Sequence, residues 1–227
     1  MLLDSRDPDI YASLGAVLGL QQRRDDAAAA AREAVRLNPD NPLEHALLGV
    51  TLGGKGDWDG QISEEREALR LDPSNDAAHY SLGLALGKKG DRDAEIAEYR
   101  EAVRLDPNDD AWHNDLGVAL EEKGDIDGAM AEYREALRSN PNNDVAHSNL
   151  GIALGNKGDW DGEITEEREA LRINAKSGTA HYSLGFALEQ KGDRWGALQE
   201  YRAAYELDPK DPDYRQAYER LLQRANH

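Results

Sequence analysis

The chain of 227 residues contains no cysteine, a single phenylalanine and far fewer basic than acidic residues. Without cysteine it can form no disulfide, no thiolate metal site and no thiol nucleophile. Its 27 Lys and Arg stand against 45 Asp and Glu, which gives a formal net charge of -18. Such a charge repels phosphate backbones and excludes nucleic acid as an expected partner. We therefore expect a protein or peptide partner whose surface is neutral or basic.

Long apolar runs are also missing. No stretch approaches the roughly 20 apolar residues that a membrane span needs. Met1 is not followed by a basic and then an apolar signal segment. These absences predict a cytoplasmic protein that does not act at a membrane. Low hydrophobic content, with Phe186 as the one phenylalanine, predicts a thin and extended core in place of a single thick one.

The chain has instead a regular period of 34 residues, marked three times over. One glycine recurs inside segments such as HYSLGLAL at residues 79–86; its positions are Gly15, Gly49, Gly83, Gly117, Gly151 and Gly185. A Gly-Asp pair keeps the same period, beginning at Gly56, Gly90, Gly124, Gly158 and Gly192. A proline follows at Pro39, Pro73, Pro107, Pro141 and Pro209, with Ala175 as the one exception.

Each period predicts two helices. In the third period, Gly90 permits a left-handed turn after the first helix, and Asp91 accepts hydrogen bonds from the free N–H groups that begin the second. Pro107 then ends the second helix. We expect Gly83 and Ala102 to be small because the two helices cross closely there, and a larger side chain would push them apart.

This pattern resembles the tetratricopeptide repeat. The family has an aromatic residue at position 4, Leu-Gly at 7 and 8, a large residue at 11, Ala at 20, an aromatic at 24, Ala at 27 and Pro at 32. The resemblance implies an all-α fold, a right-handed α-solenoid superhelix of antiparallel helix pairs. The predicted repeats are 8–41, 42–75, 76–109, 110–143, 144–177 and 178–211, with a C-terminal capping helix at 212–227. Residues 1–7 are predicted to be a remnant or lead-in of a preceding repeat, because residues 3–9 mirror residues 207–213.

Histidine replaces the aromatic residue at position 4 in five repeats, as His45, His79, His113, His147 and His181. Evenly spaced histidines could indicate a metal site. Helices of neighbouring repeats pack roughly 8–10 Å apart, however, whereas zinc holds its nitrogen ligands at about 2.0–2.1 Å. We therefore expect a structural role for these histidines, and we expect no metal and no cofactor.

Carboxylates replace the aromatic residue at position 24 in the second and fifth repeats, as Glu65 and Glu167. These two repeats are nearly copies of each other, which suggests duplication of a three-repeat block. A buried carboxylate needs a partner, and the histidine on the facing first helix is the predicted one. Such a pair is either a local structural pair or a pH-sensitive joint. Runs of carboxylates such as residues 64–67 and 132–135 are expected on solvated outer faces.

Glycine occupies position 12 in four repeats, as Gly19, Gly53, Gly87 and Gly155, where the other two have Glu121 and Glu189. Glycine inside a helix costs roughly 0.5–1 kcal/mol relative to alanine. Either a ligand or another chain comes close at these glycines, or the end of the helix tolerates the softness. The overlapping segment 49–56 resembles a phosphate-binding loop, but it lacks the Ser or Thr that holds magnesium and is predicted to lie along a helix.

By resemblance to the family, the first helices line a concave groove, and ligand contacts come from positions 2, 5, 6, 9, 12 and 13. Position 9 supplies an apolar strip with Tyr and Asn beside it, which suits an amphipathic helix or an extended peptide. Part of this strip could instead pack against the neighbouring first helices. The predicted peptide-binding residues are Val50, Tyr80, Leu84, Lys88, Asn114, Asp115, Val118, Glu122, Ser148, Asn149, Ile152, Asn156, Tyr182 and Phe186.

No Ser-His-Asp set or pair of carboxylates repeats with the convergence that catalysis requires. We therefore expect no enzyme, but an acidic protein-interaction scaffold that binds a peptide or a helix in its groove. Two alternatives stay open. The chain could be a substrate-recognition array excised from a larger enzyme such as a glycosyltransferase, or a module that self-associates through the exposed ends of its repeats.

Overall fold

The computed structural model describes residues 7–225, and every regular element in that range is an α-helix. Residues 1–6 of the predicted lead-in and residues 226–227 lie outside this range. The helices are α1 (Pro8–Leu20), α2 (Arg24–Leu37), α3 (Pro42–Gly53), α4 (Trp58–Leu71), α5 (Asp76–Lys88), α6 (Arg92–Leu105), α7 (Asp110–Glu122), α8 (Ile126–Ser139), α9 (Asp144–Asn156), α10 (Trp160–Ile173), α11 (Gly178–Gln190), α12 (Arg194–Leu207) and α13 (Pro212–Ala225). The predicted all-α class, built from helix pairs, is confirmed.

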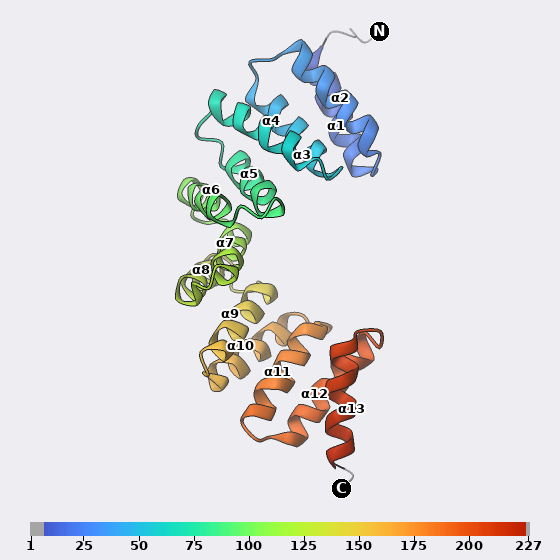
Figure 1. Ribbon diagram of the computed structural model, residues 1–227, viewed down its shortest axis with the longest axis vertical. Coiled ribbons are helices and arrows are strands. Elements are labelled where there is room, and N and C mark those ends of the chain that lie inside the picture. Colours follow the sequence, from blue (N-terminus) through green and yellow to red (C-terminus); the bar gives the residue numbers. More distant parts are fainter. Residues whose placement is uncertain (1–6, 226–227) are drawn as a thin grey trace. The chain divides into compact units, whose positions relative to one another are not determined.

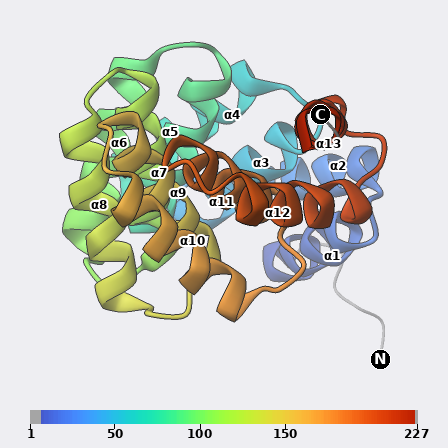
Figure 2. The ribbon, with the colours of Figure 1, turned by 90° about the horizontal axis from the view of Figure 1, so that it is seen from below.

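The chain packs as two compact units, Met1–Pro107 and Asn108–His227. The first unit contains α1 to α6 and the second contains α7 to α13 (Figure 1, Figure 2). Within each unit, the two helices of a pair pack against each other, and each second helix also packs against the next first helix. None of the described helices is long and apolar enough to cross a membrane.

The turn inside each pair follows the predicted Gly-Asp rule in five of the six pairs. Gly158 has φ 83°, in the left-handed region that favours glycine. The next residue, Asp159, accepts a hydrogen bond from the backbone N–H of Gly162 at 3.0 Å and so caps α10. The first pair has no such glycine: Gln22 takes the positive φ of 59°, and Arg23 makes no side-chain cap.

Removing one of these caps is expected to weaken the fold measurably. Asp125 accepts from the backbone N–H of Gly128 at 2.9 Å. Asp125→Ala leaves that N–H without its acceptor, and we expect the free energy of unfolding in urea to fall by about 1 kcal/mol. Asp125→Asn keeps an oxygen in the same place and is the matched control. We expect it to change the free energy of unfolding by only a few tenths of a kcal/mol. An equal loss in both variants would contradict the capping role.

The expected close crossing of paired helices is confirmed by the atoms that lie next to the glycine of each first helix. A Cβ built on Gly83 would lie 2.7 Å from Cδ1 of Tyr99, and one on Gly117 would lie 2.5 Å from Cε1 of Tyr133. Ala102 on α6 is fully buried. Five of the six pairs therefore pack a tyrosine or a glutamate of the second helix directly against the first-helix glycine, whereas the first pair has Ala31 opposite Gly15.

Helix α13 covers the end of the last pair. Its Ala217 and Leu221 are buried in the same apolar cluster as Leu184 and Tyr201. Tyr214 lies against Tyr182, with the ring centroids 5.4 Å apart. The opposite face of α13 carries charged residues, in keeping with the expected amphipathic capping helix.

Candidate functional site

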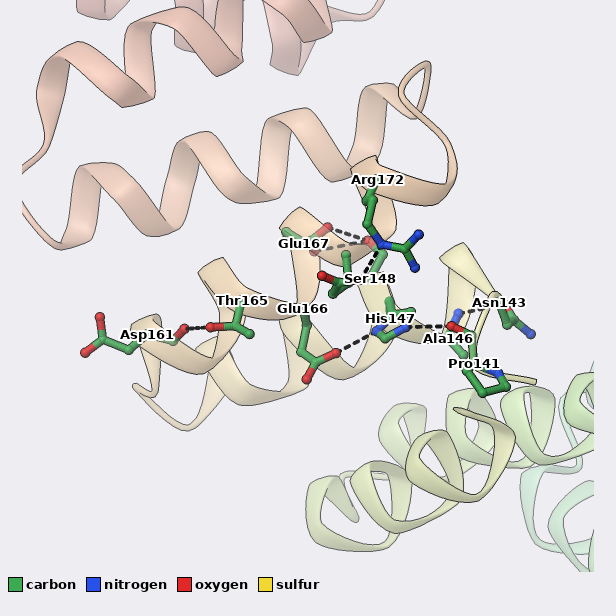
Figure 3. Close-up of polar contacts among 11 residues, drawn as sticks. Pro141, Asn143, Ala146, His147, Ser148, Asp161, Thr165, Glu166, Glu167 and Arg172 are labelled. Carbon is green, nitrogen blue, oxygen red and sulfur yellow. Dashed lines mark hydrogen bonds and ion pairs between the residues drawn. The ribbon is translucent and has the colours of Figure 1, made fainter. Parts of the chain in front are cut away.

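The histidines at position 4 join the two helices in the same way in five of the six pairs. His147 on α9 places its Nδ1 2.7 Å from Oε2 of Glu166 on α10, and its Nε2 3.3 Å from the carbonyl oxygen of Pro141 (Figure 3). The same carboxylate contact, at 2.6–2.7 Å, recurs in His45–Glu64, His79–Glu98, His113–Glu132 and His181–Glu200. The histidines are therefore structural links in the second to sixth repeats.

The predicted partner of these histidines was wrong by one residue. The imidazole of His147 contacts Glu166 and not the neighbouring Glu167, and His45 likewise contacts Glu64 and not Glu65. In the sixth pair, the hydrogen bond to Glu200 raises the pKa of His181, although partial burial opposes the shift. Among the described residues, no group of three or more His, Asp or Glu is placed to hold a metal ion.

Glu65 and Glu167 are instead buried between helices, away from the histidines. Both oxygens of Glu167 accept from the hydroxyl of Ser148, at 3.0 and 2.9 Å, and Figure 3 shows the side chain turned toward Ser148. Oε1 of Glu65 accepts from Ser81 at 2.6 Å. Burial raises the pKa of Glu65 to about 8 and that of Glu167 to about 9. These two carboxyls are thus neutral acids near pH 7, and the expected solvated face of residues 64–67 is wrong for Glu65.

Three of the four glycines at position 12, all except Gly19, have a third explanation that neither predicted alternative contained. A Cβ on Gly155 would overlap Oε2 of Glu163, which reaches across from the second helix of the same pair. Gly53 is matched in the same way by Gln61, and Gly87 by Glu95. In the fourth and sixth repeats, where position 20 is alanine, position 12 is glutamate: Glu121 accepts from Tyr133 and Glu189 from Tyr201. The first repeat has the small residues Gly19 and Ala27 at the two positions. In the second, third and fifth pairs, the glycine at position 12 makes room for a buried polar side chain from the second helix of the same repeat.

The predicted groove residues fall into three groups. Phe186, Leu84 and Val50 are exposed apolar side chains, with 40%, 37% and 55% of their surface accessible. Ser148 and Asn114 are buried, so the hydroxyl of Ser148 serves Glu167 and not a surface. The exposed polar members are Lys88, Glu122 and Asn156, and the half-buried members are Tyr80, Asp115, Val118, Asn149, Ile152 and Tyr182. Val50, Tyr80, Leu84 and Lys88 belong to the first unit, and all the others belong to the second.

Four of these residues line a pocket of about 820 Å³ in the second unit, between α9, α10 and α11. They are Ile152, Asn156, Tyr182 and Phe186, and the remaining lining residues are Gly155, Lys157, Gly158, Trp160, Glu163, Thr179 and Ser183. We call this cavity the α9–α11 pocket. The size falls within the usual range for ligand sites in proteins, which are mostly apolar with a few polar groups.

Aromatic rings form much of the pocket wall. Trp160, at the start of α10, meets Phe186 of α11 edge to face, with the ring centroids 5.8 Å apart. Tyr182 is held from behind by Tyr201 at 5.5 Å and by Tyr214 at 5.4 Å. These contacts fix the rings before any ligand arrives, which reduces the entropy lost on binding.

The two charged residues of the pocket lining differ in whether they have a partner within the protein. The ammonium group of Lys157 is paired with Asp127. Glu163 is only 3% exposed, and its Oε2 has no hydrogen-bond partner. Burial raises the pKa of Glu163 to about 7, so this carboxyl changes its charge near neutral pH.

Trp160 and Glu163 were absent from the sequence-based site because both lie on a second helix, and the family resemblance places ligand contacts on first helices. A signal for Glu163 was nevertheless present. In the second, third and fifth repeats, glycine at position 12 accompanies a long polar residue at position 20, as expected if that side chain points between the helices. The aromatic rings of the wall could not be grouped from spacing alone.

Comparison with known proteins identifies the repeat. A tetratricopeptide repeat profile matches residues 14–76, 66–110, 80–144, 114–178 and 149–212. No curated protein matches the chain in sequence. Among solved structures, PilF of Pseudomonas aeruginosa is 18% identical with a TM-score of 0.81, over 92% of this chain and 95% of that one.

Two further solved structures share the fold. YrrB, a TPR protein with an unusual peptide-binding site, is 20% identical with a TM-score of 0.71, over 85% of this chain and 99% of that chain. MamA is 26% identical with a TM-score of 0.67, over 72% of this chain and 95% of that chain. These likenesses, at low identity, establish the architecture of helix pairs.

Proposed function

This chain belongs to the tetratricopeptide repeat family, and we propose that it is a non-catalytic scaffold that binds a peptide or a helix of a partner protein in the α9–α11 pocket. Repeats of this family are protein-interaction modules.

One observation carries the choice of this site: the pocket combines an exposed phenylalanine with a preformed aromatic wall. Phe186 is 40% exposed although it touches Trp160. An apolar side chain inserted beside Ile152 and Phe186 would remove apolar surface from water, at roughly 25 cal/mol for each Å² buried. YrrB, which shares this fold, has an unusual peptide-binding site, and a ligand of the same class fits the pocket here.

The internal position of the unusual acids supports a non-catalytic role. Glu65 and Glu167 are fully buried between helices and each is hydrogen-bonded to a serine. They therefore cannot touch a substrate. Four of the histidines at position 4 are held between a glutamate and a backbone carbonyl: His45, His79, His147 and His181. A side chain fixed on both ring nitrogens has no free nitrogen with which to act on a bound molecule.

Phe186→Glu is expected to weaken peptide binding by at least about tenfold, which corresponds to about 1.4 kcal/mol. The substitution puts a charge into the apolar wall at a side chain that is partly exposed, so the fold should survive it. A phage-displayed library of random dodecamers is selected on the wild-type protein, and the affinity of enriched peptides is measured by isothermal titration calorimetry.

Trp195→Glu is the matched control, because Trp195 is 69% exposed on α12 and lines a different cavity. We expect it to leave the affinity unchanged. Peptides that bind Phe186→Glu as tightly as the wild type would contradict the proposed site. Loss of binding in Trp195→Glu alone would move the site to α12 and α13.

A further inference from the structure

We propose that the α9–α11 pocket selects a segment that carries an arginine beside an apolar side chain, with the guanidinium group bound to the carboxylate of Glu163. This inference rests on the proposed function and specifies the chemistry of its ligand. It assigns the cation-binding role to a residue on the second helix of the pair.

The first observation is the state of Glu163 itself. The side chain lines the pocket and is 3% exposed. Its Oε2 is buried, and no residue in the described part of the chain forms a hydrogen bond with that oxygen. Buried polar groups in proteins are nearly always satisfied, and a buried carboxylate without a partner is costly. A hydrogen-bond donor of a ligand in the pocket would supply the partner that this carboxylate lacks among the described residues.

The second observation comes from the near copy of this repeat in the first unit. Gln61 occupies the position of Glu163, and its Nε2 donates to the carbonyl oxygen and the hydroxyl of Ser81, at 3.1 and 2.9 Å. Only its Oε1 lacks a partner. The counterpart of Ser81 is Ser183. When ionised, Glu163 can only accept, so the carboxylate cannot satisfy the carbonyl of Ser183 as the amide satisfies that of Ser81. The fifth repeat thus has a carboxylate acceptor without a donor where the second repeat has an amide that donates to Ser81.

The charge around the pocket explains why the donor would be a cation. Lys157, the basic residue of the lining, is already paired with Asp127. Lys191, at the end of α11, is paired with Asp161 at 2.8 Å. No lining cation therefore neutralises Glu163, and the whole chain carries a formal charge of -18. Such a field attracts a basic segment and repels an acidic one.

The aromatic wall favours arginine over lysine. A guanidinium group is planar, stacks on aromatic faces and can bind a carboxylate through two parallel hydrogen bonds. Trp160, Tyr182 and Phe186 provide rings on the pocket wall, and a cation over such a ring gains further attraction. The volume of about 820 Å³ leaves room for an apolar neighbour of the arginine against Ile152 and Phe186.

The test uses the full chain, the random dodecamer phage library and synthetic versions of one enriched peptide. We expect enriched peptides to contain arginine. Replacing that arginine with citrulline, which has nearly the same shape without the charge, is expected to weaken binding to the wild type by about tenfold. Glu163→Gln is expected to weaken the arginine peptide by a similar factor, and citrulline should then make no further difference. A lysine peptide is expected to bind the wild type several-fold more weakly than the arginine peptide.

Glu163→Gln reproduces a side chain that the second repeat already accommodates at this place, so it should fold. Glu169→Gln is the matched control, since it removes the same charge from the exposed face of α10, where Glu169 pairs with Arg172. It should leave the affinity unchanged. The citrulline comparison on the wild-type protein tests the inference even if the variant were unstable.

The inference is overturned if peptides bind without a preference for arginine, or if Glu163→Gln binds the arginine peptide as tightly as the wild type. In either case, sensitivity to Phe186→Glu would leave the proposed function standing. Lysine and arginine peptides of equal affinity would refute the role of the aromatic wall. If no peptide is enriched, or if binding ignores Phe186→Glu, the proposed function fails and this inference fails with it.

Discussion

The free energy of unfolding is expected to fall as the pH rises from about 5 to 8, and Glu167→Gln is expected to remove a large part of that fall. Glu167 has no accessible surface, and its charge has only the hydroxyl of Ser148 to stabilise it. Burial raises its pKa from 4.5 to about 9. Glu65 behaves in the same way, with a pKa of about 8.

The direction of the effect follows from proton binding. Above about pH 4.5 the unfolded chain releases the proton of Glu167, whereas the folded chain retains it up to a pH of about 9. Stability falls with pH wherever the folded state binds more protons than the unfolded state. Each such group lowers the free energy of unfolding by at most about 1.4 kcal/mol for each pH unit. The raised pKa of His181 acts in the same direction at higher pH, so the wild type alone cannot isolate Glu167.

Urea unfolding at pH 5, 6, 7 and 8 of the wild type and of Glu167→Gln measures the difference in slope. The amide resembles the protonated acid in shape and keeps an oxygen for Ser148, but it does not titrate. Glu169→Gln on the same helix is the control. A hydrogen bond from Arg172 lowers the pKa of Glu169, so this group is ionised in both states throughout the range. Equal slopes for the wild type and Glu167→Gln, or a stability that rises from pH 5 to 8, would refute the neutral buried acid.

Gly155→Ala is expected to destabilise the protein by about 2 kcal/mol, as overpacking of a core does. Intrinsic preference alone predicts the opposite sign, because alanine favours a helix over glycine by roughly 1 kcal/mol. The new methyl group would overlap Oε2 of Glu163 and would lie 3.2 Å from Cζ3 of Trp160. Both side chains are at least partly buried, so neither can move away without disturbing the packing around it.

The sign is expected to reverse when Glu163 is removed. In a Glu163→Ala background the overlap with the carboxylate is gone, and the Trp160 ring, 3.2 Å from the new methyl group, can shift into the space that Glu163 leaves. Gly155→Ala should then raise the free energy of unfolding by up to about 1 kcal/mol. The double-mutant cycle would give a coupling energy of about 3 kcal/mol, at the upper end for residues in contact. Gly19→Ala is the matched control from the first repeat, because a Cβ there meets no atom within 4 Å.

Thermal or urea unfolding of the four proteins in the cycle checks this prediction. Gly19→Ala should leave the stability unchanged or raise it slightly, since α1 ends at the next residue. If Gly155→Ala behaved like Gly19→Ala in the wild-type background, the pairing of position 12 with position 20 would be wrong. The alternative that the end of the helix simply tolerates a flexible residue at position 12 would then be favoured.

The regular architecture could be predicted because its causes are local and repeat every 34 residues. Asp159 caps a helix through an N–H three residues away, and Gly158 supplies a backbone angle that other residues rarely adopt. These rules act over one turn of chain. The amphipathic pattern of α13 was likewise visible in its own residues, and Ala217 and Leu221 are buried as it requires.

The sequence by itself therefore determined the helices, their caps and the small residues at their crossings. Only the tertiary structure decided which of two adjacent glutamates meets a histidine, because Glu166 and Glu167 point in directions about 100° apart on the same helix. It also decided their charge, since protonation depends on burial and not on residue type. The α9–α11 pocket has the same origin: its walls come from three helices, and its volume and the unsatisfied Glu163 exist only once those helices pack.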